Sequence, residues 1–540
     1  MIRLNHILLA LIFLVFNQLP AFSVDERVLN WLQNDLSPTG LPRSFAIKPS
    51  KKASELVKIG KSDSVTGIIE RTIVEEGTSI YDAALWQIVS TLNGEKDNLE
   101  KARAPLRIYW EGSFGQFSSI RAGYGGQPFV YDPLDPQAIS SDPRAKGRRG
   151  FVFRIIDANG HYTMPDPLDG KTGFSKFPNY PIVHWEDWKP IAGENAWVVL
   201  AALHLYRKQY FNESTGRYTN NQAIELLLAE EIARAAMRLQ SDIGGIRMAP
   251  LGTYYHLADV NLTNGIDEII KTLDERCELV QKGNNALTRT VGQIEYPEFN
   301  IWYYEEISTE NNLSWYAAFR MLFEITGKNE YRLAMDRIEK YLHEAWDSAG
   351  ESFYQGMHFS KGSWRPNKEH FATDVQNWSV LVLGPKTLDD WFGEGTAYRI
   401  WQKTRETAGN FDDARRLRGL GFTKEENRIS VEWTAGAILA VRRLADYYSD
   451  AHTDWSSDLS KDVQSMRRGI EIYRVDLSLD EAAYSYSSRR EWIPFGWFSH
   501  DADVLSLAST AWVALIDADV NPFELKQGTG FILGVQRFKG

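Results

Sequence analysis

Acidic side chains recur along this sequence just ahead of a tryptophan in otherwise apolar segments. A protonated carboxyl can give a proton to a leaving oxygen, while a second, ionised carboxyl activates water or attacks a carbon. Hydrolysis of a glycosidic bond needs such a pair of groups. The pattern supplies five candidates, which are Asp82, Glu194, Glu310, Asp374 and Glu432.

Glu310 is the first choice for the proton donor, and Asp374 and Glu194 are the choices for the base. Glu310 stands in a run of polar residues that opens a segment made otherwise of Leu, Trp, Tyr, Ala, Phe and Met. Amide side chains beside these acids are suited to bind sugar hydroxyls. The amides expected to do so are Asn195, Asn311, Gln376 and Asn377.

Each acid also has a purely structural explanation. Polar side chains cap helices, and a negative charge near a helix N-terminus is favoured by about 0.3 to 1 kcal/mol. One acid would therefore mean little. Several carboxylates gathered in one concavity repel one another and raise some of their pKa values, and this convergence favours a catalytic role.

Aromatic side chains in loops are candidates for stacking on sugar rings. Two clusters contain Pro or Gly and precede a predicted helix, and they offer Trp185 and Trp188 in one case and Trp497 in the other. Trp110 and Glu111 form a further candidate pair. The alternative is that these aromatic side chains close the end of the fold, since Trp packs well in large cores.

The elements that must position these residues are predicted to be helices, because apolar residues recur at spacings of three and four. Residues 221–240 and 329–346 are amphipathic, which predicts outer helices with one exposed side, and Glu225 and Glu230 are expected on that side. The segments that begin with an acid have no polar face and predict buried inner helices. A sixth such segment runs from Asp503 to Trp512.

An inner helix, a short turn, an outer helix and a long loop repeat along the chain, which predicts an array of helical hairpins. Two long insertions, 107–190 and 244–306, are rich in Gly, Pro and aromatic residues. Loops of this length are usually functional or have structure of their own. They are expected to form the walls of a cleft on one face.

The six helix starts, together with the hairpin at 325–331, resemble the six-hairpin, or (α/α)6-toroid, superfamily of glycoside hydrolases, polysaccharide lyases and sugar epimerases. The resemblance implies an all-α fold and a single catalytic domain over residues 24–540. It also implies a substrate cleft where the inner helices begin, with carboxylates there as general acid and base. The residues that match this placement are Glu310, Glu194, Asp374, Glu432 and Asp82.

The N-terminal residues 1–23 are expected to be a signal peptide, with a positive charge at Arg3, an apolar run over 7–16 and small residues up to Ser23. That run is too short to span a membrane, so the mature protein is expected to be periplasmic or secreted, without stable membrane insertion. Cys277 is the single cysteine, which excludes an internal disulfide. The net charge of −11 disfavours nucleic acid as a partner. A carbohydrate substrate is expected, with no cofactor and no metal, and the oligomeric state is left open.

Three other functions stay open at this point. A polysaccharide lyase would use a tyrosine or histidine as base and a cation to neutralise a uronate, for which 252–256 and Arg247 are available. A non-catalytic export or assembly factor for an exopolysaccharide would use the hairpins as a binding surface. A terpenoid-cyclase-like toroid is disfavoured by the polar helix starts and the predicted export. The excess of acids at the helix starts favours a glycoside hydrolase acting on a polysaccharide or oligosaccharide.

Overall fold

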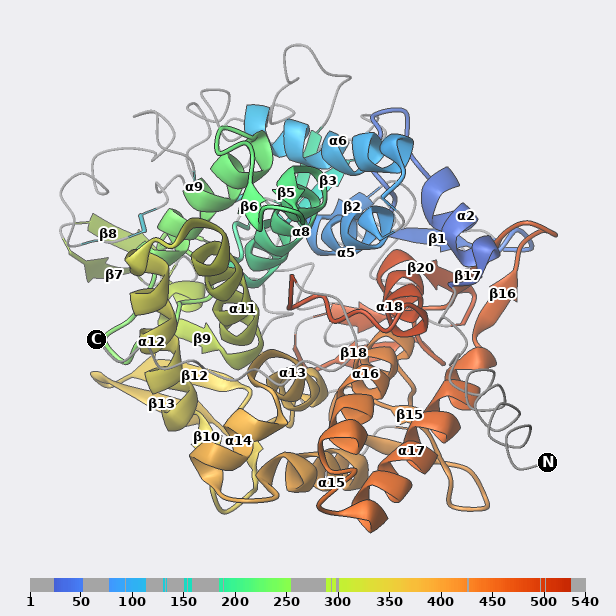
Figure 1. Cartoon of the computed structure of the whole chain (residues 1–540). Coiled ribbons are helices and arrows are strands. Elements are labelled where there is room, and N and C mark those ends of the chain that lie inside the picture. The colour runs from blue at the N-terminus through green and yellow to red at the C-terminus, as the bar shows by residue number, and fades with distance from the viewer. Residues whose placement is uncertain are drawn as a thin grey trace, which may run out of the picture.

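The computed structural model describes residues 24–51, 77–92, 94–112, 130–131, 133, 150–152, 154–157, 184–187, 189–253, 288–292, 294–297, 301–424, 427–495, 497–500 and 502–525. In this part of the chain six helices surround a central axis, and each contacts the next until the sixth contacts the first (Figure 1). These inner helices are α5 (Ile80–Thr91), α8 (Ala192–Tyr210), α11 (Thr309–Thr326), α13 (Thr373–Leu383), α16 (Val431–Tyr447) and α18 (Leu507–Asp517). The predicted signal peptide and Cys277 lie outside the described residues.

A second ring of helices covers the inner ring (Figure 1). Its members are α6 (Lys96–Gly112), α9 (Ile224–Arg238), α12 (Asn329–Glu344), α14 (Pro385–Phe392) with α15 (Thr396–Ala408), α17 (Thr453–Glu471) and α2 (Glu26–Asn34). Helix α2 packs on α18, so the first and last described helices form the sixth pair. The fold is the predicted all-α (α/α)6 toroid. None of its described helices is long and apolar enough to cross a membrane.

Both predicted outer helices are present, but one was assigned the wrong exposed side. Helix α12 buries Tyr331 and Ile338 as expected. In α9, however, Glu225 and Glu230 are buried rather than exposed. Arg103 donates to Glu225 with Nε 2.6 Å from Oε1, and the hydroxyl of Tyr331 donates to Oε1 of Glu230 at 3.2 Å. Acidic side chains can therefore lie on the core side of α9, because side chains of neighbouring helices pair with them.

The described strands form only small sheets, as the absence of long period-two alternation predicts. Two sheets have three antiparallel strands, in the orders β2-β3-β4 and β13-β12-β9, and the others have two. A single 3-10 turn, η4 (Trp302–Glu305), leads into β9. The three-stranded sheets comprise β2 (Gly77–Ser79), β3 (Ile155–Asp157), β4 (His184–Asp187), β9 (Glu306–Ser308), β12 (Gly356–Ser360) and β13 (Ser363–Asn367). The two-stranded sheets pair β1 (Phe45–Ile47) with β20 (Val504–Ser506), β5 (Phe211–Asn212) with β6 (Arg217–Tyr218), β7 (Thr288–Val291) with β8 (Ile294–Pro297), β10 (Trp346–Asp347) with β11 (Ser352–Phe353), β14 (Gly409–Phe411) with β15 (Leu417–Leu420), β16 (Arg474–Asp476) with β17 (Ala482–Tyr484), and β18 (Glu491–Ile493) with β19 (Trp497–Ser499).

A polar side chain four residues after the N-cap fixes the start of five inner helices. In α11 the amide of Asn312 donates to the N-cap carbonyl of Ser308 at 2.8 Å, and it also pairs with the backbone N–H and C=O of Ile246 at 2.7 and 3.1 Å. Each such residue thereby ties its helix to a preceding loop or strand. We call these residues clamps. The five clamps are Asn195, Asn312, Gln376, Thr434 and Thr510.

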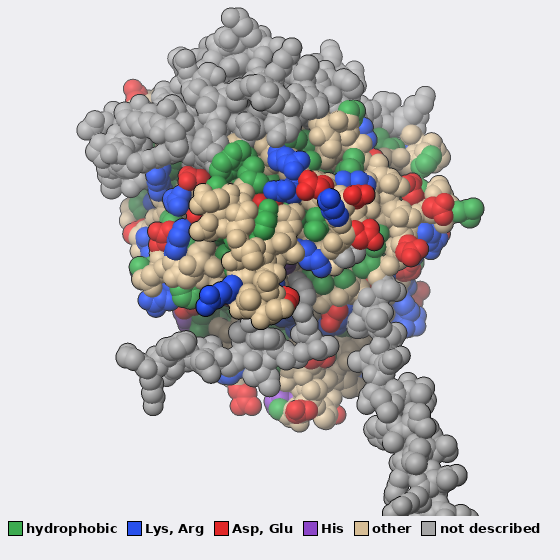
Figure 2. Space-filling view, turned by 45° about the horizontal axis from the view of Figure 1, so that its top comes forward, with side chains coloured by type: hydrophobic (Ala, Val, Ile, Leu, Met, Phe, Trp, Pro, Cys, Tyr) green, Lys and Arg blue, Asp and Glu red, His purple; other side chains and the backbone are tan. Residues whose placement is uncertain are grey.

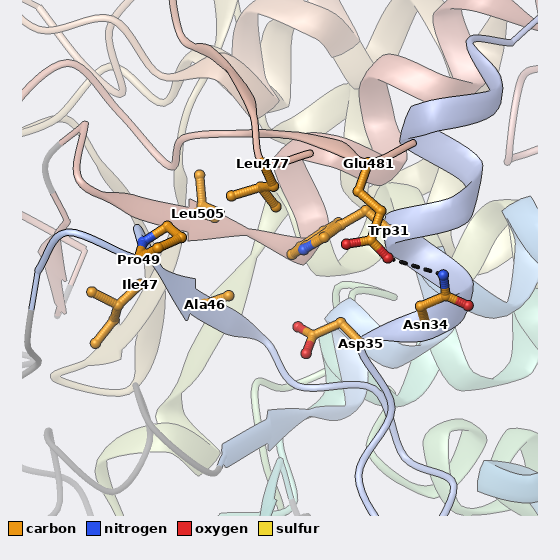
Figure 3. A pocket seen from close by; sticks show the side chains of 9 residues that line it. All are labelled: Trp31, Asn34, Asp35, Ala46, Ile47, Pro49, Leu477, Glu481 and Leu505. Carbon is orange, nitrogen blue, oxygen red and sulfur yellow. Dashed lines mark hydrogen bonds between the residues drawn. The ribbon is translucent and has the colours of Figure 1, made fainter. Parts of the chain in front are cut away.

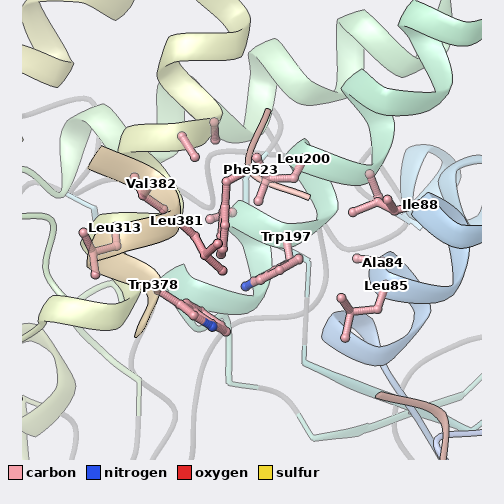
Figure 4. Close-up of a cluster of buried hydrophobic side chains, with 14 of the residues drawn as sticks. Ala84, Leu85, Ile88, Trp197, Leu200, Leu313, Trp378, Leu381, Val382 and Phe523 are labelled. Carbon is pink, nitrogen blue, oxygen red and sulfur yellow. The ribbon is translucent and has the colours of Figure 1, made fainter. Parts of the chain in front are cut away.

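Three indoles and a phenylalanine fill the axis of the toroid. Trp197, Trp378 and Trp512 stand at the same position, six residues after the N-cap, on alternate inner helices. The centroid of the Trp197 ring lies 5.3 Å from that of Trp378 and 6.0 Å from that of Trp512, and Phe523 is packed 5.0 Å from Trp197 (Figure 4). The intervening helices have smaller residues at this position, which leaves room for the indoles; these residues are Leu85, Ser314 and Gly436.

The sixth inner helix begins later than predicted. Helix α18 starts at Leu507, and its first turn contains no acid. Asp503 was expected in that turn, but it precedes β20 and pairs with Lys48 at 3.3 Å and Lys51 at 3.2 Å. Ser506 is the N-cap, because its hydroxyl accepts from the backbone N–H of Ser509 at 3.2 Å. Five of the six inner helices therefore have an acid in the first turn, and α18 has none.

The outer surface has mixed charge. On the face in Figure 2, basic and acidic side chains are interspersed over the described elements rather than gathered by sign. That face offers no large basic patch for a polyanion.

Candidate functional site

Five carboxyl groups stand in the first turns of five neighbouring inner helices. Each is the second or third residue after its N-cap, so all lie at the same end of the toroid. The charges of three other acids of the set act on Glu310 and those of two act on Glu432, so the five first turns lie close to one another. The five predicted acids are thus brought together: Asp82, Glu194, Glu310, Asp374 and Glu432.

Glu310 has the environment most favourable to a neutral carboxyl. Burial, and then the charges of Asp374, Glu194 and Glu432, raise the pKa of Glu310 well above its ordinary value. The hydroxyl of Ser314 donates to Oε1 at 3.2 Å. The other oxygen has no hydrogen-bond partner among the described residues and is not sealed from solvent. Glu310 is thus suited to hold a proton and to offer it to a bound molecule.

Asp374, on the adjacent helix α13, is held differently. Burial raises its pKa to about 7, against the opposing effect of backbone N–H groups. The N–H of Val375 donates to Oδ1 at 2.8 Å. These amides favour the ionised form, so Asp374 gives up its proton near neutral pH while Glu310 keeps its own.

Glu432 and Asp82 form the other side of the concavity. Burial raises the pKa of Glu432 to about 8, with contributions from Asp82 and Asp374, and the hydroxyl of Tyr81 donates to its Oε1 at 2.5 Å. Burial raises the pKa of Asp82 to about 7, although a hydrogen bond from Ser44 opposes this. Both groups are nearly neutral under mildly acidic conditions.

One cation meets the acid cluster within the described residues that surround it. Arg154 pairs with Glu194 at 3.1 Å, and its charge also acts on Asp82. Arg154 comes from the long insertion 107–190, where it precedes β3 and accepts a backbone hydrogen bond from Ile80 at the start of α5. This insertion therefore contributes to the site, as expected, but Arg154 itself was not predicted because nothing in its local sequence marks it.

Tyr81 was also missed as a site residue. It stands two residues after its N-cap, which is the position that Glu310, Asp374 and Glu432 occupy on their helices. Aligning the six helix starts by N-cap, rather than by acid, would have identified it.

The four predicted amides divide into two kinds. The nitrogens of Asn311 and Asn377 are buried without a hydrogen-bond partner among the described residues, so both remain candidates for binding a hydroxyl. The prediction is wrong for Asn195, and for Gln376 as well, because both are clamps whose hydrogen bonds go to backbone groups. Asn195 is fully buried and has no donor left for a sugar.

The aromatic predictions are tested only in part. Trp110 lies in the last turns of outer helix α6, packed against the core, so it is not the loop residue that was expected. The side chains of Glu111, Trp185, Trp188 and Trp497 lie outside the described residues. A described member of the second predicted loop cluster, Phe495, stacks on Trp433 with ring centroids 6.0 Å apart.

The residues considered for a lyase give that alternative no support. The guanidinium of Arg247 lies over the ring of Tyr304, 4.1 Å from its centroid, and donates to the carbonyl of Tyr304 at 2.7 Å. It is absent from the charges that act on Asp82, Glu310, Asp374 and Glu432. Residues 254–256 lie outside the described chain.

A separate cavity of about 340 Å³ lies where α2 meets β1 and β20 (Figure 3). Trp31, Leu477 and Leu505 form its apolar part, while Asn34 and Glu481 are joined by a hydrogen bond of 2.9 Å. None of the five acids lines it. Within the described residues, no group of three or more His, Cys, Asp or Glu side chains is arranged to hold a metal ion.

Comparison with known proteins gives similarity of overall architecture alone. No protein-family model matches the chain, and no curated protein matches it. Among solved structures, a D-mannose isomerase shares 9% identity with a TM-score of 0.49, covering 91% of this chain and 95% of its own. The cellobiose 2-epimerase of Spirochaeta thermophila shares 13% identity with a TM-score of 0.46, and the match covers 92% of this chain and 94% of the epimerase. The GH76 alpha-mannanase of Bacteroides thetaiotaomicron shares 11% identity with a TM-score of 0.44, and the match covers 91% of this chain and 93% of the mannanase. Values this low assign no activity to the chain.

Proposed function

We propose that this chain is a glycoside hydrolase that cleaves a polysaccharide or oligosaccharide, with Glu310 as general acid and Asp374 as general base. The observation behind the proposal is the contrast between these two buried neighbours. Burial and then three other carboxylates keep the proton on Glu310, whereas for Asp374 burial raises the pKa to about 7 and backbone N–H groups oppose it by favouring the ionised form. Two carboxyls whose environments separate their pKa values are suited to act as acid and base.

Asp374 is a better base than Glu194, the other residue predicted for that role. One oxygen of Glu194 is engaged in an ion pair with Arg154 at 3.1 Å, so it is not free to accept a proton from water. In the proposed reaction the proton of Glu310 moves to the glycosidic oxygen as the bond from that oxygen to the anomeric carbon breaks. Asp374 takes a proton from water, and the water oxygen bonds to the anomeric carbon. Proton exchange with solvent then restores both carboxyls.

The cleft also has features suited to a neutral sugar. Asn311 and Asn377 each follow closely after a proposed catalytic acid in sequence and have an amide nitrogen without a partner among the described residues. A polymer rich in uronic acids would find little positive charge to pair with, because Arg154, the described cation beside the acids, is already paired with Glu194. Residues 1–23 support export, and we place the mature protein in the periplasm or outside the cell.

The test is to incubate the purified mature protein with a panel of neutral and acidic glycans. New reducing ends without ultraviolet absorbance are expected, while an unsaturated, absorbing product would identify a lyase. Glu310→Gln should lower the rate by about 10²- to 10⁴-fold with an unchanged melting temperature. Full turnover by this variant would contradict the assignment of the acid, and inactivity of the wild type on every glycan would contradict the proposed function.

A further inference from the structure

Tyr81 bridges the gap that α18 leaves in the ring of acids. Ala508 and Ser509 occupy the positions on α18 that hold acids on the other helices, and both are small and buried. Across this helix the hydroxyl of Tyr81, from α5, reaches Oε1 of Glu432, on α16, at 2.5 Å. The two helices flanking α18 are thus joined at the level of the acids.

The direction of this hydrogen bond is fixed by a third residue. The indole Nε1–H of Trp512, on α18, can only donate, and it lies 3.0 Å from the oxygen of Tyr81. Tyr81 therefore accepts from Trp512 and uses its single hydrogen to donate to Glu432. The edge of the Tyr81 ring is also held against Trp197, with centroids 5.1 Å apart, so the phenol has little freedom to turn.

Because Trp512 donates to Tyr81 and Tyr81 donates to Glu432, the two oxygens of Glu432 differ. Oε1 accepts from Tyr81, so a proton on Glu432 is carried by Oε2. Oε2 has no hydrogen-bond partner among the described residues and is not sealed from solvent. It is thus the oxygen that a bound molecule can reach.

The surroundings of Glu432 favour its neutral form. The residue is 7% exposed. The titratable groups that act on it are Asp82 from α5 and Asp374 from α13, together with Tyr81, and Glu432 acts in turn on Glu310 of α11. No cation acts on it within the described residues. A carboxyl that is buried among other acids keeps its proton and becomes a hydrogen-bond donor.

We propose that Glu432 works as a neutral carboxylic acid whose Oε2–H donates to an oxygen of a neutral sugar, and that Tyr81 is a positioning residue that occupies Oε1 and so directs the proton to Oε2. Glu432 then binds the substrate, while the proton that is transferred comes from Glu310. The inference rests on the proposed function for the identity of the ligand. The protonation of Glu432 and its dependence on Tyr81 do not rest on it.

The first test needs no substrate. An infrared difference spectrum of wild type against Glu432→Gln at neutral pH should contain the carbonyl band of a protonated carboxyl. Tyr81→Phe should keep this band to higher pH, because its loss of a hydrogen bond to the ionised form raises the pKa of Glu432. Tyr109→Phe is the matched control, since the Tyr109 hydroxyl is buried and has no partner among the described residues; its spectrum should equal that of the wild type. Absence of the band at neutral pH would overturn the proposal.

The second test uses the glycan on which the wild type is active. Glu432→Gln keeps a donor beside a carbonyl and should lower kcat/KM by less than about 10-fold, whereas Glu432→Ala should lower it by about 10- to 100-fold. Tyr81→Phe should raise KM about 3- to 10-fold with little change in kcat, and should add nothing to Glu432→Ala. Loss of activity in Glu432→Gln as complete as in Glu310→Gln would mean that Glu432 works ionised, and would overturn the proposal. If no glycan is cleaved, the proposed function fails and the infrared result still decides the state of Glu432.

Discussion

At the scale of single residues, the chemistry of the site depends on where an acid is placed on its helix. A carboxylate in the first turn gains about 0.3 to 1 kcal/mol from the helix dipole. For Asp374 burial outweighs this gain, since a pKa raised from 3.8 to about 7 corresponds to about 4 kcal/mol in favour of the neutral form. The same first-turn position that stabilises an ordinary surface acid therefore creates a proton donor or a poised base in the concavity.

The rate of hydrolysis should depend on pH through Asp374. The base must be ionised, so the rate is expected to rise as pH passes through about 7 and then to level off while Glu310 remains protonated. Asp374→Asn should lower the rate by about 10²-fold or more, because water loses its proton acceptor. Initial rates measured across this pH range, with buffer and ionic strength held constant, check both effects. A wild-type rate that is flat across neutral pH would contradict the role of Asp374.

Gly193→Ala should disturb the site without unfolding the protein. A Cβ at Gly193 would lie 2.0 Å from Oδ1 of Asn311, so the amide must move. We expect kcat/KM to fall about 10-fold through the loss of one hydrogen bond, and the free energy of unfolding to fall by about 1 to 3 kcal/mol because the buried Asn311 side chain is displaced. Gly436→Ala is the control, since its Cβ meets nothing closer than 3.6 Å. Equal activity in both variants would show that the position of Asn311 is unimportant.

At the scale of the elements, the clamps determine how each inner helix is set into the ring. Asn312→Ala should lower the free energy of unfolding by about 2 to 5 kcal/mol, because it leaves the buried N–H and C=O of Ile246 without partners. Urea unfolding measures this loss. Asn34→Ala removes an exposed hydrogen bond to Glu481 and should change stability by less than about 0.5 kcal/mol. Similar losses in the two variants would contradict the role given to the clamp.

Much of the arrangement of the helices could be predicted from the sequence. Five inner helices begin at the predicted acids, because a buried helix shows its polar residues only at its start. The sixth was misplaced because Asp503 mimics such a start, whereas Ser506 is the N-cap. Two of the clamps, Asn195 and Gln376, were predicted to bind a ligand, since a sequence does not reveal that the hydrogen bonds of Asn195 are already taken by Val152 and Ile191. Arg154 depends on a contact between distant segments, which local spacing does not encode, whereas an alignment of the helix starts by N-cap identifies Tyr81.

At the scale of the whole molecule, the gathered acids make stability depend on pH. In the unfolded chain Asp82, Asp374 and Glu432 ionise near pH 4, whereas in the folded protein they keep their protons to about 7, 7 and 8. The folded state therefore binds more protons over this interval, and the free energy of unfolding should fall as pH rises through it. The contribution is fully present below about pH 4.

Thermal unfolding measured between about pH 5 and pH 9 checks this dependence. The melting temperature should decline towards alkaline pH in the wild type. It should decline less steeply in the double variant Asp82→Asn/Glu432→Gln, which lacks two of the groups that must ionise. A melting temperature that rises towards alkaline pH would contradict the buried, protonated state of the cluster.

The ring is closed by the two ends of the described chain. Helix α2 packs on α18, and Phe45 of β1 pairs with Ser506 of β20. Because a polypeptide is synthesised from its N-terminus, the partners of α2 and β1 are the last to be made. Until then the inner flank of α5 that α18 later covers stays exposed, with its apolar side chains open to aggregation. Closure of the ring must therefore follow synthesis of α18, and fragments that stop before α18 should be substrates for chaperones or proteases rather than folded toroids.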